Sequence, residues 1–287
     1  MSHVISIDGL SFTYPKSKTP AVRDMSFGVA SGEIFGFLGP SGAGKSTTQK
    51  ILTGLLRGHG GTVSVWDKDP AAWKSDYYRH IGVSFELPNH YLKLTGRENL
   101  EFFASLYPGK TEDPMTLLDR VGLADAAHTR VAKYSKGMQM RLVFVRALLH
   151  RPELLFLDEP TSGMDPNNAR VIKDIITELR SEGRTIFLTT HDMRTADELC
   201  DRVAFVVDGR IAALDTPAEH KLSRSKRVVT VTYRSGESLA VKDFPMDGLG
   251  ADAEFRELMN SRAVEAVHSQ EADLDDVFID VTGRALT

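Results

Sequence analysis

The chain has 287 residues, of which 41% are hydrophobic and 26% charged, and its formal net charge is -4. This composition is typical of a soluble globular protein with one large or two smaller domains, and it excludes a disordered chain. Charges of both signs are dispersed, so there is no broad basic surface for nucleic acid; the short basic cluster at residues 221–227 is interpreted as a solvated linker.

The single cysteine and the absence of long apolar runs point to a cytoplasmic location. Cys200 excludes an internal disulfide, and its apolar helical setting, ADELCDRV, predicts a reduced packing residue. The N-terminus, MSHVISIDG, lacks the features of a signal peptide, and no run approaches the roughly 18 apolar residues of a spanning helix. If the protein works at a membrane, we expect a partner to supply the span.

Strand-like and helical runs alternate through most of the chain, which predicts α/β architecture with a parallel sheet. A helix is expected from about Gly44 to Leu55, and Thr95 and Glu98 have the spacing of a capping box that opens another. TLLDRVGL and QMRLVFVRALL continue this helical region. The expected strands of the first half are VISIDGLSF, MSFGVA, EIFGFLG, TVSVW and IGVSF.

The second half begins with LLFLD, residues 154–158, an apolar run ended by an acid, as in a buried strand whose carboxyl end meets solvent. Asp165 and Pro166 suit the cap and first position of a helix. TIFLTT predicts a further strand, RVAFVVDGRIAAL a hairpin, and TPAEH a short helix. From about Ser225, VVTVTY, SLAV, FRELMN and LDDVFIDV predict a small α+β appendage.

A phosphate-loop pattern, G-x-x-x-x-G-K-[ST], lies between a predicted strand and a predicted helix. Its glycines let backbone N–H groups close around phosphates, and the helix N-terminus adds a favourable dipole. Lys45 would neutralise the β- and γ-phosphate oxygens, and Ser46 would offer its hydroxyl to Mg²⁺. The residues of the loop are Gly39, Pro40, Ser41, Gly42, Ala43, Gly44, Lys45, Ser46 and Thr47.

An acidic pair at the end of LLFLD supplies the second chemical signal. Asp158 can hold Mg²⁺ through water, and Glu159 can polarise an attacking water. By itself such a pair is more often a helix cap or a surface pair. With a phosphate loop about 110 residues earlier, catalysis is the favoured interpretation.

These residues resemble the ATP-binding subunit of ABC transporters, over roughly residues 4–222. YSKGMQMR is similar to the family signature L-S-G-G-Q, and SGMD and THD follow the acids in the family's order. The resemblance implies a P-loop NTPase core of ABC type in residues 1–222, with an antiparallel β subdomain and a helical subdomain at about residues 87–150. Residues 223–287 would form a small accessory domain.

The resemblance also implies a role for each matching residue. Tyr14 would stack on adenine, although such an aromatic is by itself more often a half-buried strand residue. Ser135 and Gly137 would reach the γ-phosphate bound by the opposite subunit. Asp165 would lie at the subunit contact, and His191 would hold the γ-phosphate and the attacking water in line. With Lys45 and Glu159, His191 completes the expected catalytic set.

Three signature positions depart from the family pattern: Tyr134, Lys136 and Met138 replace Leu, Gly and Gln. A lysine at a helix N-terminus is unfavourable to the dipole, but near phosphate it adds attraction, so we expect a competent site. The Y-S-K-G-M signature and the ending LDDVFIDVTGRAL resemble exporter ATPases of the drug, antibiotic and bacteriocin type.

The resemblance implies an ATPase that binds ATP and Mg²⁺ and lies on the cytoplasmic face of the membrane, with no nucleic-acid partner. Two such subunits, identical or different, would clamp two ATPs head to tail and drive an integral-membrane exporter bound near residues 88–107. One alternative is a soluble ABC-type ATPase acting on ribosomes or nucleic acid, which usually has two ATPase halves or a long basic insertion. Another is a binding module with a decayed ATPase, against which the complete catalytic set argues.

One residue is an acid where the family has an amide. In this family a glutamine that contacts Mg²⁺ follows the strand matching IGVSF, but no glutamine occurs between Ile81 and Asn99. Counting from the strand gives Glu86 this role, as a third metal contact after Ser46 and Asp158, with Asn89 as runner-up. A carboxylate binds Mg²⁺ more strongly than an amide does but repels a metal-free γ-phosphate. The alternative is a surface acid with no contact to nucleotide.

Overall fold

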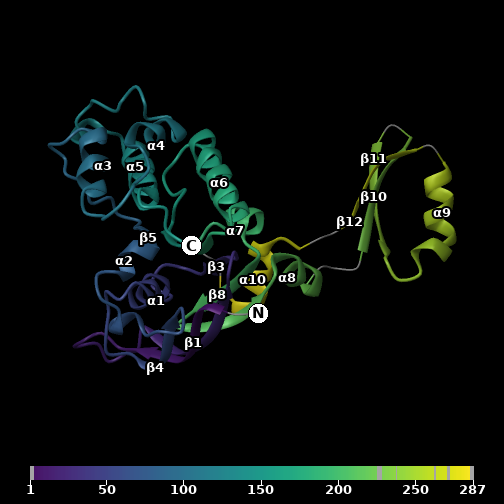
Figure 1. Ribbon diagram of the computed structural model, residues 1–287. Helices are drawn as coiled ribbons and strands as arrows, with labels where there is room; N and C mark the ends of the chain where they lie inside the picture. The colour runs from purple at the N-terminus through teal and green to yellow at the C-terminus, as the bar shows by residue number, and fades with distance from the viewer. Residues whose placement is uncertain (1–2, 225–227, 237, 262, 270–271, 285–287) are drawn as a thin grey trace. The chain divides into compact units, whose positions relative to one another are not determined.

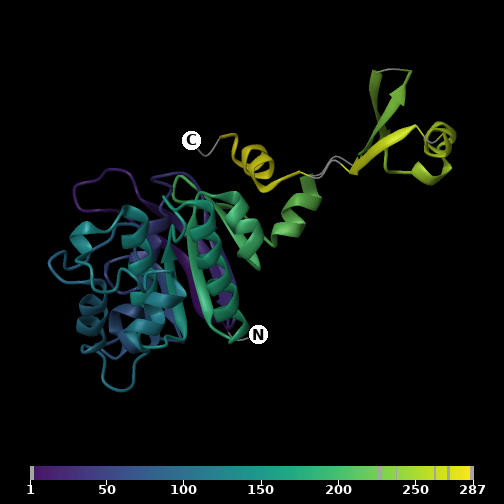
Figure 2. The same ribbon diagram turned by 90° about the horizontal axis from the view of Figure 1, so that it is seen from above.

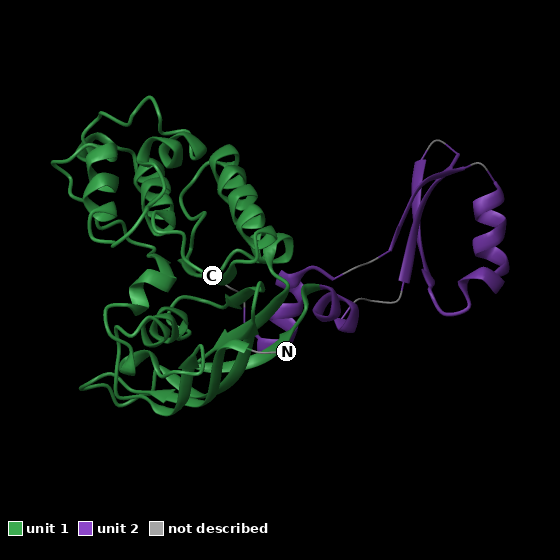
Figure 3. Ribbon diagram, viewed as in Figure 1, with its two compact units in different colours: residues 1–217, 286–287 green, residues 218–285 purple. Residues whose placement is uncertain are grey.

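The computed structural model of the chain describes residues 3–224, 228–236, 238–261, 263–269 and 272–284. It divides into two compact units, Met1–Pro217 and Ala218–Ala285, each of which is described by itself (Figure 3). Residues 225–227 of the basic cluster, and residues 285–287 at the end of the chain, lie outside the described part.

A six-stranded sheet forms the centre of the first unit. Strands β3, β6 and β7 are buried at every position, which explains their continuous apolar runs. Strands β5, β6, β7, β3 and β8 are parallel, as predicted. Strand β9 is antiparallel to β8, as the predicted hairpin requires, and a tight turn with positive φ at Asp208 and Gly209 joins them. In spatial order the strands are β5 (Ile81–Ser84), β6 (Leu154–Asp158), β7 (Thr185–Thr190), β3 (Ile34–Leu38), β8 (Arg202–Val207) and β9 (Arg210–Asp215).

A second, antiparallel sheet shares its core with the first. It contains β2 (Val22–Ala30), β1 (His3–Phe12) and β4 (Gly60–Val65), in that order. The ring of Phe27 from β2 stacks on that of Phe35 from β3, with centroids 5.2 Å apart. The antiparallel β subdomain that the family resemblance implies is therefore packed directly on the central sheet.

Helices of the first unit include a group, α3, α4 and α5, that lies together away from the antiparallel sheet (Figure 1). The predicted capping box is present: Thr95 and Glu98 bond to each other's backbone N–H. Helix α1 ends at Leu52, three residues before the expected end, and Gly54 then has a φ of 73°. The helices are α1 (Lys45–Leu52), α2 (Tyr77–His80), α3 (Gly96–Ala104), α4 (Pro114–Arg120), α5 (Lys136–Leu148), α6 (Pro166–Ser181) and α7 (Met193–Leu199), with 3-10 turns at Pro70–Ala72 and Val131–Lys133.

The second unit contains a small antiparallel sheet in the order β11-β10-β12. Helix α9 packs against one face of this sheet, where the Phe244 and Phe255 rings meet edge to face at 5.3 Å (Figure 2). The sequence pattern does not indicate β12, most of whose side chains are exposed. The elements are α8 (Pro217–Arg224), β10 (Val228–Ser235), β11 (Ser238–Pro245), η3 (Leu249–Ala251), α9 (Ala253–Asn260), β12 (Val264–Ser269) and α10 (Leu274–Thr282).

Candidate nucleotide site

The phosphate loop connects β3 to α1 and is closely packed on its outer side. A Cβ atom at Gly39 would lie 2.1 Å from the carbonyl oxygen of Val206, and one at Gly44 would lie 2.5 Å from that of Ala21. Gly44 also has a φ of 106°, which side chains rarely adopt. Only glycine fits at these two positions, so the backbone can keep the tight turn in which loop N–H groups form a nest for an anion.

Lys45 begins α1 and reaches back over the loop. Its Nζ atom donates hydrogen bonds to the carbonyl oxygens of Gly39, at 2.5 Å, and Pro40, at 3.1 Å. Burial lowers the pKa of Lys45, and the negative charges of Glu159, Asp158 and Glu86 oppose this effect. The buried ammonium group is thus surrounded by carbonyl oxygens and acids, which suits an exchange of these partners for phosphate oxygens.

Asp158 is the last residue of β6 and contacts the first turn of α1 and the end of β7. Its Oδ2 atom accepts a hydrogen bond from the Ser46 hydroxyl at 3.3 Å, and the Thr189 hydroxyl donates to Oδ1. Burial raises the pKa of Asp158, and the charges of Glu159 and Glu86 act in the same direction. The sequence motifs do not include Thr189, although its place near the end of a strand that lies beside LLFLD could have indicated a contact with Asp158.

The donors around Asp158 fit Mg²⁺ that is bound together with nucleotide. No group of three or more His, Cys, Asp or Glu side chains in the described ranges is arranged to hold a metal ion by itself. Mg²⁺ is usually bound by one or two carboxylates together with substrate phosphates and water. Ser46 and Asp158 would hold the ion. The charge of Glu86 acts on the Asp158 carboxylate.

Glu159 is held by three contacts with the end of β7. Its backbone N–H donates to the Thr189 carbonyl at 2.9 Å, and its Oε2 atom accepts from the Thr190 hydroxyl at 3.0 Å. Its Oε1 atom lies 2.6 Å from Nδ1 of His191. Glu159 has a φ of 50°, a conformation that persists in a non-glycine residue only where its surroundings impose it. The sequence motifs do not indicate this role of Thr190 either.

Glu86 and Asn89, the two candidates for the third metal contact, differ in their surroundings. Both the backbone and the side-chain oxygen of Asn89 accept hydrogen bonds from the Arg146 guanidinium, at 3.0 and 2.6 Å. Asn89 is therefore part of the packing between the loop and α5. Glu86 is exposed, and its charge acts on both Lys45 and Asp158.

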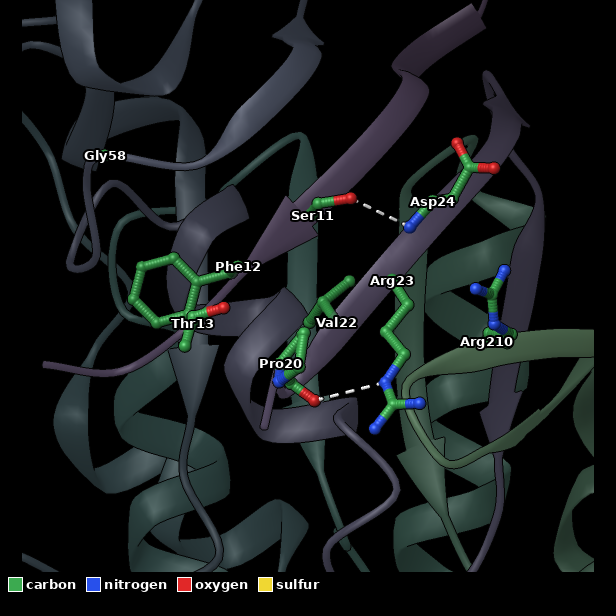
Figure 4. A pocket seen from close by; sticks show the side chains of 9 residues that line it. All are labelled: Ser11, Phe12, Thr13, Pro20, Val22, Arg23, Asp24, Gly58 and Arg210. Atoms are coloured by element: carbon green, nitrogen blue, oxygen red, sulfur yellow. Dashed lines mark hydrogen bonds between the residues drawn. The ribbon is translucent and has the colours of Figure 1, made fainter. Parts of the chain in front are cut away.

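Tyr14 lies beside the phosphate loop. Its hydroxyl is 3.1 Å from the Thr47 hydroxyl, and its ring meets Phe12 edge to face. An open hollow of about 610 Å³ lies next to this region (Figure 4). Two residues of its wall, Val22 and Arg23, directly follow Ala21, whose carbonyl oxygen lies close to Gly44. The hollow is lined by Ser11, Phe12, Thr13, Pro20, Val22, Arg23, Asp24, Gly58 and Arg210.

The signature residues lie together at the start of α5. Ser135 caps this helix by accepting from Met138 N at 3.2 Å, and a Cβ at Gly137 would lie 3.8 Å from the Gly163 carbonyl oxygen. Asp165 caps α6 through the N–H of Asn168 at 3.1 Å. No hydrogen bond among the described residues links this group to the phosphate loop of the same chain.

Tyr134 explains one departure from the signature pattern. Its side chain is buried, and its hydroxyl donates to the carbonyl oxygen of Ala126 at 2.7 Å. A Cβ at Gly96 would lie 2.2 Å from this hydroxyl. Tyr134 is therefore a packing residue that joins α3 to the segment before α5.

Comparisons with known proteins show the family of the chain. A family model described as ABC transporter matches residues 22–162. The fluoroquinolones export ATP-binding protein of Mycobacterium tuberculosis is 68% identical over 287 residues, which cover 100% of this chain and 95% of that protein. The chain belongs to the ABC transporter family. A second model, the fluoroquinolone efflux ABC transporter C-terminal domain, matches residues 227–271 of this ABC ATPase.

Other relatives and solved structures support the same assignment. The daunorubicin/doxorubicin resistance ATP-binding protein of Streptomyces peucetius is 32% identical and covers 99% of this chain and 93% of that protein. The structure of an ATP-binding subunit of an ABC transporter has a TM-score of 0.69 at 29% identity, covering 77% of this chain and 92% of that one. A dimeric bacterial ABC transporter cassette has a TM-score of 0.67 at 25% identity, covering 74% and 98%.

The family assignment confirms several expectations. The fold is the ABC-type P-loop fold, the protein is an ATPase, and its cofactors are ATP and Mg²⁺. The likeness to ATP-binding proteins of drug and antibiotic exporters is also confirmed. As an ABC ATPase the chain pairs with a second ATPase subunit and with a membrane partner. None of the helices in the described ranges is long and apolar enough to cross a bilayer.

Proposed function

We propose that this ABC ATPase drives an integral-membrane exporter from the cytoplasmic face of the membrane, with fluoroquinolone-like drugs as the cargo class. One observation carries the proposal: the chain is 68% identical over 287 residues to a fluoroquinolones export ATP-binding protein. The orientation of Glu159 by Thr190 and His191 supports it. The cassette would span residues 1–222, and residues 223–287 would form an accessory domain.

Within the cassette, each group has a defined chemical task. Lys45 leaves the carbonyl oxygens of its own loop to contact the β- and γ-phosphates. Ser46 and Asp158 would hold Mg²⁺, with Glu86 as a third contact, and the ion would neutralise charge on the phosphates. Glu159 takes the proton of the attacking water. His191, which is hydrogen-bonded to Oε1 of Glu159, holds the water and the γ-phosphate in line.

The second half of each site comes from the second ATPase subunit. Ser135, Gly137 and Asp165 are grouped at two helix starts, and in the described part of the chain they make no hydrogen bond to their own phosphate loop. In an isologous pair the same groups meet the nucleotide of the partner, so each subunit completes both sites. Tyr14 stacks on adenine after it leaves Thr47. ATP favours the closed pair because only that state makes both sets of phosphate contacts, and hydrolysis removes the preference.

The membrane subunit docks on an apolar hollow next to Glu86. This hollow, of about 250 Å³, is lined largely by aromatic and aliphatic side chains, with Arg146 at its wall and no acid in its lining. Exposed apolar side chains gather on the neighbouring loop and helix, and such surfaces mark binding sites. They are Leu87, Tyr91, Leu92, Phe102 and Leu106. Since the loop that carries Glu86 borders both sites, it can pass the state of the nucleotide to the transporter.

Transport by the reconstituted complex tests the proposal. The membrane subunit is identified by co-purification from native membranes, and the complex is then placed in inverted vesicles with a fluoroquinolone outside. We expect uptake that needs ATP and Mg²⁺ and is lost in Glu159→Gln, with no loss in Glu182→Gln, an exposed acid at the end of α6. Uptake that is independent of ATP, or unchanged in Glu159→Gln, would overturn the proposal.

A further inference from the structure

The small sheet of the second unit has two edge strands that differ in how they are protected. Strand β11 pairs with β10 at eight successive positions without a register shift. Strand β12 is shorter, and its register shifts between Thr232 and Tyr233. Short strands and irregular register are ways in which proteins prevent sheet edges from pairing with other chains. Strand β11 has neither, and its one proline, Pro245, stands at its last position, so β11 is the less protected edge.

Strand β11 also places apolar side chains on the face of the sheet opposite to α9. Phe244 of β11 is buried toward α9, and strand alternation therefore directs Leu239 and Val241 to the other face. These two side chains are 61% and 66% exposed. In both overall views, α9 lies beside one face of the sheet only (Figures 1 and 2).

The charged side chains of β11 do not protect this edge, because each is used within the unit. Lys242 forms an ion pair with Glu254 of α9. Asp243 accepts a hydrogen bond from the Thr230 hydroxyl at 2.6 Å. Charges that protect an edge strand normally point outward from it. Here they stabilise the unit's own fold, and no strand of the described ranges pairs with the outer edge of β11.

We propose that β11 pairs antiparallel with β11 of a second copy of this chain and so forms a continuous six-stranded sheet. A second copy is the occupant that fits because two strands with the same sequence form an isologous pair, in which each contact occurs twice. ATPase subunits of this family also pair, which brings a second copy within reach. The inference concerns the accessory domain and does not depend on the catalytic roles proposed above.

The charges of β11 select one register. In an antiparallel pair, residues directly opposite share one face, so the two-fold axis must pass midway between the two copies of one residue. Centring on Lys242 or Asp243 would place like charges opposite each other, and centring on Val241 would place Leu239 opposite Asp243. Centring on Ala240 places Leu239 of each copy opposite Val241 of the other. We infer this register, because it covers both exposed apolar side chains.

Disulfide cross-linking of the full chain tests the register. The only native cysteine, Cys200, is buried, and burial raises the pKa of its thiol, so it does not compete. Under mild oxidation without nucleotide, Ala240→Cys should give a covalent dimer at least ten times faster than Glu257→Cys on α9, since directly opposite residues lie near disulfide distance. Ser238→Cys, two residues along β11, should cross-link no faster than Glu257→Cys. Equal rates for Ala240→Cys and Glu257→Cys would overturn the proposal.

A charge at the edge supplies the second test. In the Ala240→Cys protein, Val241→Lys should slow cross-linking at least tenfold, whereas Val267→Lys, at an exposed valine on the other edge strand, should leave it unchanged. Circular dichroism spectra of both variants check that they fold. Because the oxidation is done without nucleotide, Lys45→Ala in the Ala240→Cys protein should leave the cross-linking rate unchanged. Slowing by Val267→Lys but not by Val241→Lys would refute pairing through β11.

Discussion

The Nδ1 atom of His191 lies 2.6 Å from Oε1 of Glu159, while Thr190 donates its hydroxyl to the other oxygen of the same carboxylate. Both oxygens are therefore oriented before nucleotide arrives, and the side chain has little freedom to lose in the reaction. The two donors are the last residue of β7 and the residue that follows it, and the acid directly follows β6, so the pairing of these parallel strands sets the geometry.

Replacing Glu159 by glutamine should separate hydrolysis from binding. Glu159→Gln keeps the hydrogen bond from Thr190 but removes the base, so we expect unchanged ATP affinity and hydrolysis slower by roughly 10² to 10⁴. Phosphate release measures the rate, and light scattering after gel filtration detects the trapped ATP-bound pair. Near-normal turnover would exclude Glu159 as the base. Glu182→Gln is the matched control.

Removing the Lys45 ammonium should weaken nucleotide binding. Charge-assisted hydrogen bonds contribute about 1.5 to 3 kcal/mol each, so Lys45→Ala should raise the dissociation constant of ATP roughly 10- to 150-fold. Calorimetric titration measures this constant. Lys50→Ala, at an exposed lysine of the same helix, should leave it unchanged. Equal ATP affinity in Lys45→Ala and the native chain would contradict the phosphate-loop assignment.

Glu86 should couple the binding of metal and nucleotide. Because its carboxylate repels the γ-phosphate when no metal is present, Glu86→Gln should bind metal-free ATP more tightly and need more Mg²⁺ for half-maximal activity. A fluorescent ATP analogue titrated with and without Mg²⁺ reports the first effect, and a Mg²⁺ titration of phosphate release reports the second. Glu101→Gln on α3 is the control. If Glu86→Gln changes neither quantity, Glu86 is a surface acid.

His90 should make the stability of the chain sensitive to acid. Its Nε2 atom lies 2.9 Å from the Gln139 carbonyl, which only an N–H can donate to, and burial together with Arg146 lowers the pKa of His90 to about 4. The unfolded chain takes up a proton near pH 6.5 and the folded chain does not, so this contribution is complete above pH 6.5 and is lost as the pH falls toward 4. The expected loss is about 2 kcal/mol between pH 7 and pH 5.

Urea unfolding at these two pH values measures the loss. His90→Gln removes the titrating group, so its unfolding free energy should change less between pH 7 and pH 5 than that of the native chain. His128→Gln, at an exposed histidine, should behave like the native chain. The same change in all three proteins would show that His90 titrates normally in the folded state.

The local pattern of the sequence determined most of the elements and the motif chemistry. Continuous apolar runs indicated β3, β6 and β7, and cap residues such as Thr95 and Asp165 marked helix starts, because these signals come from neighbouring residues. The spacing of Lys45 and Ser46 indicated a phosphate loop for the same reason. Strand β12 gave no signal, since most of its side chains face solvent.

Only the tertiary structure decided which side chains meet. Thr189 and Thr190 become partners of Asp158 and Glu159 because β7 pairs with β6, and the sequence does not state that pairing. Asn89 is withdrawn from the site by Arg146, more than fifty residues away in the chain. Contacts between distant segments depend on how the sheet and helices pack, so the sequence named the chemical groups and the fold set their partners.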